Sequence, residues 1–178
     1  MLKVLKFGGS SMADAAHYKR VRQIVQADPD RRVVVVSAAG KRQDDDTKIT
    51  DLLYLCYAHL QYGVSCDGIY QRIVERYCSI RDELGLKTDL ESEFAALREE
   101  MDKGISQDAL VSRGEYFSAI LMAEYLGFEF IDASRWLCFH FDGTIDQGKS
   151  YATLRTLAKG KKVVIPGFYG LMPDGKIR

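Results

Sequence analysis

VVVVSAAG (residues 33–40) is the stretch that decides the fold class of this 178-residue chain. Its four consecutive valines do not alternate with polar residues, so the strand that they predict is buried on both faces. Strands of this kind are typical of parallel sheets that are covered by helices. Small residues follow the valines and leave room for a ligand to approach the backbone at the carboxyl end of the strand.

Further strands are predicted on both sides of this stretch. Residues 2–7 alternate as a strand does, with Leu2 and Val4 on one face and Leu5 and Phe7 on the other. Three more segments have strand patterns, the second of them more exposed than the others: 128–134, 136–143 and 161–166.

Helices are predicted between these strands. Apolar periodicity and breaker residues indicate six of them: 12–27, 51–62, 66–84, 89–102, 106–126 and 147–159. The first helix is expected to bury the stripe Tyr18, Val21, Ile24 and Val25. Because helices alternate with strands, the sequence predicts an α/β fold with a parallel-rich central sheet sandwiched by helices.

The composition limits the kind of protein. The chain is globular, at 47% hydrophobic and 28% charged residues, and its net charge of zero gives no excess to attract nucleic acid or an anionic membrane. No apolar run approaches a membrane span in length, and no signal peptide is evident. The cysteines and histidines show no metal-ligand or catalytic-triad spacing, so we expect reduced thiols in a cytoplasmic protein.

The segment FYGLMPDGKIR (168–178) predicts a β-hairpin with a Pro-Asp-Gly turn. Its second strand is short, so we expect the chain to continue in the natural protein. We therefore interpret residues 1–178 as the N-terminal lobe of a larger domain.

The first strand leads into a candidate phosphate site, the segment KFGGSS. Gly8 and Gly9 free their backbone N–H groups to converge on an anion, and Lys6 adds a positive charge beside them. Ser11 is expected to cap the following helix, with Asp14 three residues later. The plain alternative is a tight turn with an exposed lysine.

A carboxylate lies in the middle of an apolar helix stripe. At helical spacing, Glu115 shares one arc with four apolar residues: Val111, Ala119, Met122 and Leu126. Such a carboxylate must find a hydrogen-bond donor or shift its pKa. Glu115 is either a structural glutamate bonded to backbone or lysine, or a carboxylate that receives the ammonium group of a ligand.

Thr50 lies at the start of another predicted helix, before Asp51. It is either a plain N-cap or a site residue. The polar loop before it, GKRQDDDTK, mixes charges of both signs, and we interpret this loop as a solvated connection.

Four motifs together resemble a known family. KFGGSS, VVVVSAAGK with TDLL, SRGEYFSA and IPGFYG occur in the order and approximate spacing of the aspartate kinases, within the amino-acid kinase family. The resemblance covers nearly the whole chain and corresponds to the N-terminal half of the catalytic domain. It implies phosphoryl transfer from MgATP to the side-chain carboxylate of L-aspartate, the first step toward lysine, threonine and methionine. It further implies ATP and L-aspartate as partners, Mg²⁺ carried by the nucleotide, and a homo-oligomeric full-length protein.

The resemblance also implies site residues. Lys6 matches the catalytic lysine, which contacts the ATP phosphates together with Phe7, Gly8, Gly9 and Ser10. The L-aspartate site is implied to comprise five residues: Ser37, Thr50, Glu115, Gly167 and Phe168. We expect both groups to converge at the carboxyl edge of the sheet.

In the family, an S-R-G-G-S-D segment, the adenine pocket and regulatory ACT domains follow this part of the chain. None of them lies within residues 1–178, so the resemblance implies that the isolated chain is inactive. Two alternatives stay open. One is a related kinase that acts on acetylglutamate, glutamate, carbamate or UMP, although the SRGE helix and the helical insert at 51–104 favour aspartate. The other is a non-catalytic ligand-binding module, against which the combination of Lys6, Thr50 and Glu115 argues.

Overall fold

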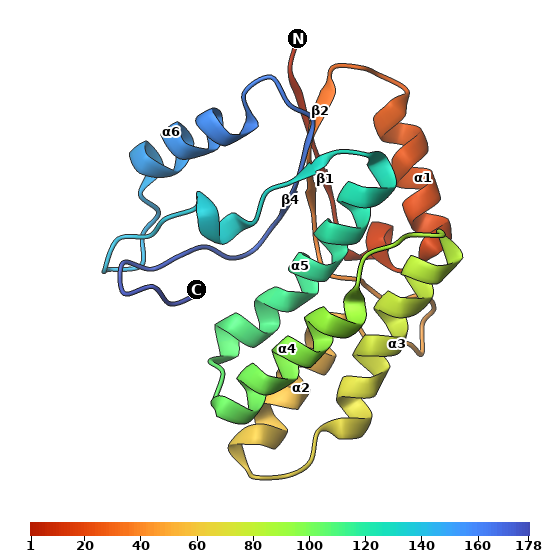
Figure 1. Ribbon diagram of the computed structural model, residues 1–178, viewed down its shortest axis with the longest axis vertical. Helices are drawn as coiled ribbons and strands as arrows, with labels where there is room; N and C mark the ends of the chain where they lie inside the picture. Colours follow the sequence, from red (N-terminus) through yellow and green to blue (C-terminus); the bar gives the residue numbers. More distant parts are fainter.

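Four parallel strands form the central sheet of the computed structural model, which describes residues 1–178 (Figure 1). In chain order the strands are β1 (Lys3–Phe7), β2 (Arg31–Val36), β3 (Glu129–Phe130) and β4 (Val163–Pro166). Their order in the sheet is β1-β2-β4-β3, so the valine run of β2 is hydrogen-bonded to a neighbour on each side. The predicted parallel α/β architecture is confirmed.

Six α-helices and two 3₁₀ helices connect the strands. The α-helices are α1 (Ala15–Gln26), α2 (Ile49–Gln61), α3 (Asp67–Glu83), α4 (Leu90–Lys103), α5 (Gln107–Leu126) and α6 (Gln147–Ala158). The 3₁₀ helices are η1 (Gly9–Met12) and η2 (Ala133–Arg135). Helices α1 and α5 cover one face of the sheet, α2 to α4 complete that helical layer, and α6 lies on the opposite face (Figure 1).

The alternation along β2 divides its valines between two cores. Val34 and Val36 are buried in the main core between the sheet and the large helical layer. Val33 packs with Ile165 in a smaller cluster under α6. Both faces of the strand therefore carry apolar contacts, as the uninterrupted valine run predicts.

The start of the first helix differs from the sequence prediction. Residues 9–12 form η1, and α1 begins only at Ala15. Asp14 is the N-cap, because its side chain accepts a hydrogen bond from the backbone N–H of His17 at 2.9 Å. The expectation that Ser11 caps this helix is wrong. Ile24, which was expected on the buried stripe, is 46% exposed.

Two predicted strands are shortened or missing. The strand expected over 128–134 is reduced to β3, since the side chain of Asp132 accepts from the N–H of Ser134 and turns the chain into η2. The exposed strand expected over 136–143 does not form. In its place are isolated bridges, one of which joins Cys138 to Leu171.

The predicted hairpin at 168–178 is confirmed. Gly170 and Arg178 exchange backbone hydrogen bonds of 2.9 and 3.1 Å, and Gly175 in the turn has a φ of 84°. None of the helices combines the length and the apolar character needed to cross a membrane.

Candidate functional site

The loops that follow β1 and β2 are packed backbone against backbone. The N–H of Gly40 donates to the carbonyl of Gly9 at 2.8 Å. A Cβ atom on Gly40 would lie 2.6 Å from the carbonyl carbon of Gly9, and one on Gly9 would lie 3.1 Å from the carbonyl oxygen of Ala38. Gly40 therefore has no room for a side chain, and a side chain on Gly9 would be tightly packed, because the two backbones approach so closely.

Helix α5 approaches the loop after β2 from the helical layer. A Cβ atom on Gly114 would lie 2.7 Å from the Cβ of Ala38, so the absence of a side chain lets the loop rest on the helix. The hydroxyl of buried Tyr77 donates to the carbonyl of Gly114 at 2.7 Å and accepts from the N–H of Ala39 at 3.4 Å. This tyrosine from α3 thereby ties the loop to α5.

Glu115, the next residue on α5, turns its carboxylate toward this loop. Its Oε1 accepts a hydrogen bond from the N–H of Ala38 at 3.3 Å, whereas its Oε2 is buried without a hydrogen-bond partner. The residue is only 6% exposed, and burial raises the pKa of its carboxyl group to about 7. The structural alternative therefore accounts for one carboxylate oxygen and leaves the other without a partner.

A polar cavity of about 500 Å³ opens beside this carboxylate. It lies at the carboxyl edge of the sheet, among the loops after β1 and β2, and its ten lining residues are Gly9, Ser10, Ser37, Ala38, Ala39, Gly40, Lys41, Lys48, Thr50 and Glu115. We call it the edge cavity. Glu115 supplies its negative charge, and the two lysines supply positive charge.

The N-terminus of α2 borders the edge cavity. Helix α2 begins at Ile49, whose N–H donates to the carbonyl of Ala39 at 3.0 Å. The next two N–H groups, of Thr50 and Asp51, have no partner within the chain. Free N–H groups in the first turn of a helix favour an anion. The N-cap alternative for Thr50 is wrong, since Lys48 occupies that position and Thr50 lies inside the first turn.

Five of the predicted site residues line the edge cavity: Gly9, Ser10, Ser37, Thr50 and Glu115. Lys6 and Gly8 lie at the end of β1 outside its lining. Phe7 belongs to the main core. Because Leu5 and Phe7 contact that core, alternation turns the exposed side chain of Lys6 toward the face that α6 covers.

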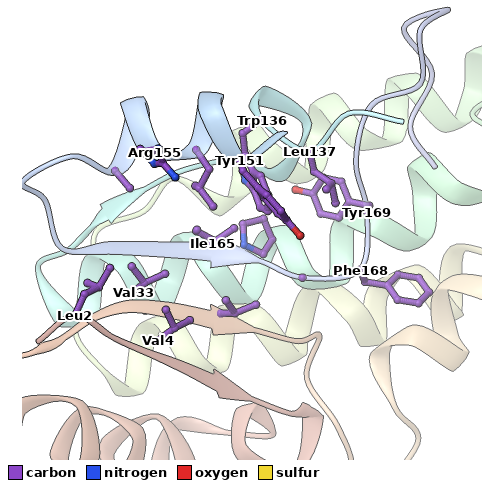
Figure 2. Close-up of a pocket in the computed structure, with 15 residues that line it drawn as sticks. Leu2, Val4, Val33, Trp136, Leu137, Tyr151, Arg155, Ile165, Phe168 and Tyr169 are labelled. Atoms are coloured by element: carbon purple, nitrogen blue, oxygen red, sulfur yellow. The ribbon is translucent and has the colours of Figure 1, made fainter. Parts of the chain in front are cut away.

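Gly167 and Phe168 belong to a second cavity, on the α6 side of the sheet (Figure 2). It measures about 470 Å³ and is mostly apolar, with Trp136 and Tyr151 in its wall. The N–H of Gly167 donates to the carbonyl of Val36 at 3.0 Å, which places the start of this loop at the carboxyl edge as expected. Phe168 is 72% exposed. Of the ten predicted site residues, five therefore line the edge cavity, two line this second cavity, and Lys6, Phe7 and Gly8 line neither.

Sequence reasoning missed Lys41 and Lys48. Both lie in the polar segment GKRQDDDTK, whose composition predicts a solvated connection, yet both line the edge cavity. The signal that could have identified Lys48 is its position directly before the helix that follows a parallel strand in the chain. No signal in the sequence pointed to Tyr77, whose role depends on contacts with residues far away in the chain.

Comparisons with known proteins agree on the kind of fold and family. The model of the amino acid kinase family matches residues 1–178. Aspartokinase 3 of Bacillus subtilis is 34% identical over 99% of this chain and 42% of its own length. The chloroplastic aspartokinase 3 of Arabidopsis thaliana is 30% identical over 69% of this chain and 23% of its own length.

Solved structures give the same result. Aspartate kinase of Clostridium acetobutylicum is 40% identical, with a TM-score of 0.95 over 98% of this chain and 41% of that one. Aspartokinase III of E. coli, solved with aspartate and ADP, is 24% identical and has a TM-score of 0.79, over 99% of this chain and 43% of that one. The latter likeness concerns the fold alone. The chain spans about two fifths of the length of the B. subtilis relative and of these two structures.

Proposed function

Because this chain belongs to the amino acid kinase family, we propose that the protein containing it is an aspartate kinase. The reaction transfers the terminal phosphoryl group of MgATP to the side-chain carboxylate of L-aspartate and yields aspartyl phosphate and ADP. Similarity to the aspartate kinase of C. acetobutylicum and to aspartokinase 3 of B. subtilis supports this activity. We propose that the complete protein is also a homo-oligomer, in keeping with the family resemblance.

One observation carries the proposal: the buried, unpaired Oε2 of Glu115 beside the edge cavity. An amino acid brings an ammonium group and a carboxylate to its site. The ammonium group would supply the missing donors to Glu115, and the free N–H groups of Thr50 and Asp51 would receive a carboxylate. A site with both features suits a zwitterion better than a simple anion.

The proposed reaction needs no general base. The side-chain carboxylate of aspartate has a pKa near ~4 and is already ionised at neutral pH, so it is a ready nucleophile. The enzyme must offset the repulsion between this anion and the nucleotide and hold both in line. Lys41 and Lys48 lie where they would reduce that repulsion.

We place the ATP phosphates at the end of β1, beside Lys6 and Gly8. A Cβ atom on Gly8 would meet nothing within 4 Å, so open space adjoins this backbone. Lys6 is exposed and free to turn its ammonium group over the sheet edge. Magnesium would arrive bound to the nucleotide as part of the substrate.

The test is a panel of phosphoryl acceptors offered to the complete enzyme with MgATP. Hydroxylamine traps acyl phosphates from L-aspartate, L-glutamate and N-acetyl-L-glutamate, and ADP release reports on carbamate and UMP. We expect ATP consumption with L-aspartate alone. Activity with another acceptor and none with aspartate would assign a different kinase of the family. Binding of aspartate without turnover on any acceptor would favour the non-catalytic module.

A further inference from the structure

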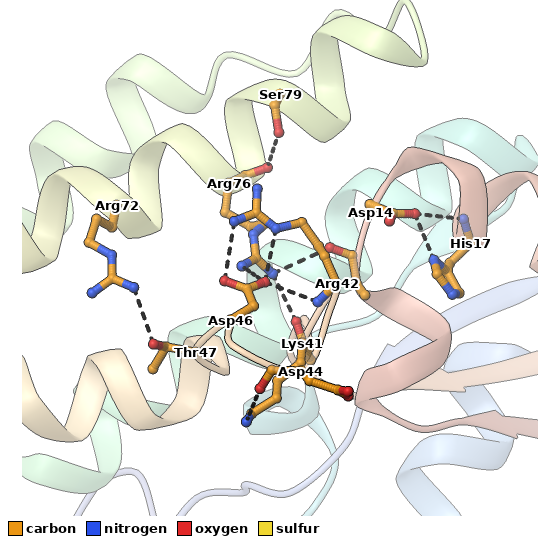
Figure 3. Close-up of polar contacts among 12 residues, drawn as sticks. Asp14, His17, Lys41, Arg42, Asp44, Asp46, Thr47, Arg72, Arg76 and Ser79 are labelled. Carbon is orange, nitrogen blue, oxygen red and sulfur yellow. Dashed lines mark hydrogen bonds and ion pairs between the residues drawn. The ribbon is translucent and has the colours of Figure 1, made fainter.

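The strongest unassigned polar cluster surrounds Arg76, on α3 (Figure 3). This arginine is 4% exposed and does not line the edge cavity. One guanidinium nitrogen donates to the carbonyl of Gly40 at 2.8 Å and to that of Ala13 at 3.4 Å. The second terminal nitrogen, Nη2, donates to the carboxylate of Asp46 at 2.5 Å.

Each of these three partners belongs to a different part of the site's framework. Ala13 follows η1 in the connection after β1, and Gly40 ends the small-residue loop after β2. Asp46 lies in the segment between Lys41 and Lys48. A planar guanidinium holds its partners at fixed angles, so one side chain sets the relative positions of all three segments.

Asp46 is the counter-ion that makes this arrangement tolerable in the interior. Its side chain is 7% exposed, and Arg42 also donates to it, at 2.9 Å from Nε. Hydrogen bonds from Arg42 and the charge of Arg76 hold the pKa of Asp46 well below its usual range. A buried guanidinium without such a partner would be strongly destabilising.

We infer that Arg76 is a positioning residue of the edge cavity: with Asp46 it fixes the Gly40 carbonyl and the segment that carries Lys41 and Lys48. The inference rests on the proposed function for its kinetic consequence. Loss of the Arg76 guanidinium removes no side chain from the edge cavity, but it lets the lysines and the α2 N-terminus move away from a bound amino acid.

The test compares Arg76→Lys with Arg81→Lys in the complete enzyme. Arg81 lies on the same helix and pairs with Asp82 and Glu91, away from the edge cavity. We expect Arg76→Lys to raise the aspartate KM by about tenfold and to leave kcat within about threefold of the wild-type value. The guanidinium contacts position the edge cavity before and during transfer alike, so their loss weakens binding more than it slows the chemical step. Arg81→Lys should leave both constants unchanged. Suppose instead that Arg76→Lys lowers the Tm as much as Arg81→Lys does and leaves the aspartate KM unchanged. Arg76 would then be a structural residue with no positioning role.

Hydrogen exchange gives a second readout that requires no turnover. Arg76→Lys should speed exchange of the backbone amides in residues 37–49 relative to wild type, and Arg81→Lys should not. Equal exchange in both variants would overturn the positioning role even if the proposed reaction holds. Conversely, faster exchange in an enzyme that does not use aspartate would keep the positioning role and reject the proposed function. If Arg76→Lys does not fold, Asp46→Glu keeps the ion pair but displaces the segment, and it should raise the aspartate KM in the same way.

Discussion

At the scale of single residues, the carboxylate of Glu115 makes stability depend on pH. Burial raises its pKa to about 7, from an ordinary value of 4.5. Between these values the folded chain holds a proton that the unfolded chain releases, so stability falls as pH rises through this window. The shift corresponds to a loss on the order of 3 kcal/mol. A group that destabilises its own fold at neutral pH is typical of a functional site.

Glu115→Gln should remove this pH dependence. The free energy of unfolding of the variant minus that of wild type should become more positive by on the order of 3 kcal/mol from pH 4.5 to pH 8. Urea denaturation at several pH values measures the difference. Glu124→Gln, on the same helix, is the control. Its stability relative to wild type should change with pH in the opposite direction. Hydrogen bonds from Thr88 and Lys87 outweigh burial there and lower the pKa of Glu124. Parallel pH profiles for the two variants would contradict the assignment of a raised pKa to Glu115.

At the scale of elements, the contact between α5 and the loop after β2 shapes the edge cavity. Gly114→Ala would place a methyl group 2.7 Å from the Cβ of Ala38 and 3.2 Å from Leu53. We expect a loss of about 1–3 kcal/mol in the free energy of unfolding, the range for overpacking. The control is Gly68→Ala on α3, where a new Cβ meets nothing within 4 Å. That change should be neutral or stabilising by up to about 1 kcal/mol, because alanine is the better helix former. Equal urea midpoints for the two variants would be inconsistent with this packing.

Elements with strong periodicity could be predicted from the sequence. The valines of β2 and the arc around Glu115 were both interpreted correctly, since burial on two faces and helical spacing leave direct marks on the residue order. Glu115 is buried together with Val111, Ala119, Met122 and Leu126. The strand predicted over 136–143 was wrong. The alternating apolar residues of this segment form only isolated bridges, one of them to the hairpin, instead of a ladder in the sheet.

Contacts between distant residues could not be predicted. Asp46 and Arg76 are thirty positions apart, and neither residue's neighbours indicate an ion pair. The polar composition of the loop around Asp46 suggested solvation, whereas that carboxylate is buried against two arginines. Composition reports the average environment of a segment, and such an exception depends on tertiary packing.

At the scale of the whole molecule, the two faces of the sheet are unequal. The large helical layer closes one face, whereas α6 covers the other only in part and leaves Val4 63% exposed (Figure 1). Most of the predicted site residues are divided in the same way. Glu115 and Thr50 line the edge cavity, whereas Gly167 and Phe168 line the apolar cavity under α6. Lys6, at the end of β1, alternates with core residues and faces the α6 side of the sheet.

In the proposed function, Glu115 receives the ammonium group of an amino-acid substrate. This interaction exists before and during phosphoryl transfer, so its loss should affect binding far more than the rate of the chemical step. Succinate is a dicarboxylate without an ammonium group, so its binding should not depend on Glu115. Glu124 again supplies the control, because its carboxylate bonds to Lys87 and Thr88 and lies outside the edge cavity.

The most direct measurement is the steady-state KM for L-aspartate in the complete enzyme, with Glu115→Gln and Glu124→Gln compared to wild type. We predict a rise of about 10–100-fold for Glu115→Gln, equivalent to ~1.4–2.7 kcal/mol of lost binding. The succinate inhibition constant should stay within a few-fold, and Glu124→Gln should match wild type in both. An aspartate KM that does not change in folded Glu115→Gln would make Glu115 a structural carboxylate and exclude it as the ammonium site.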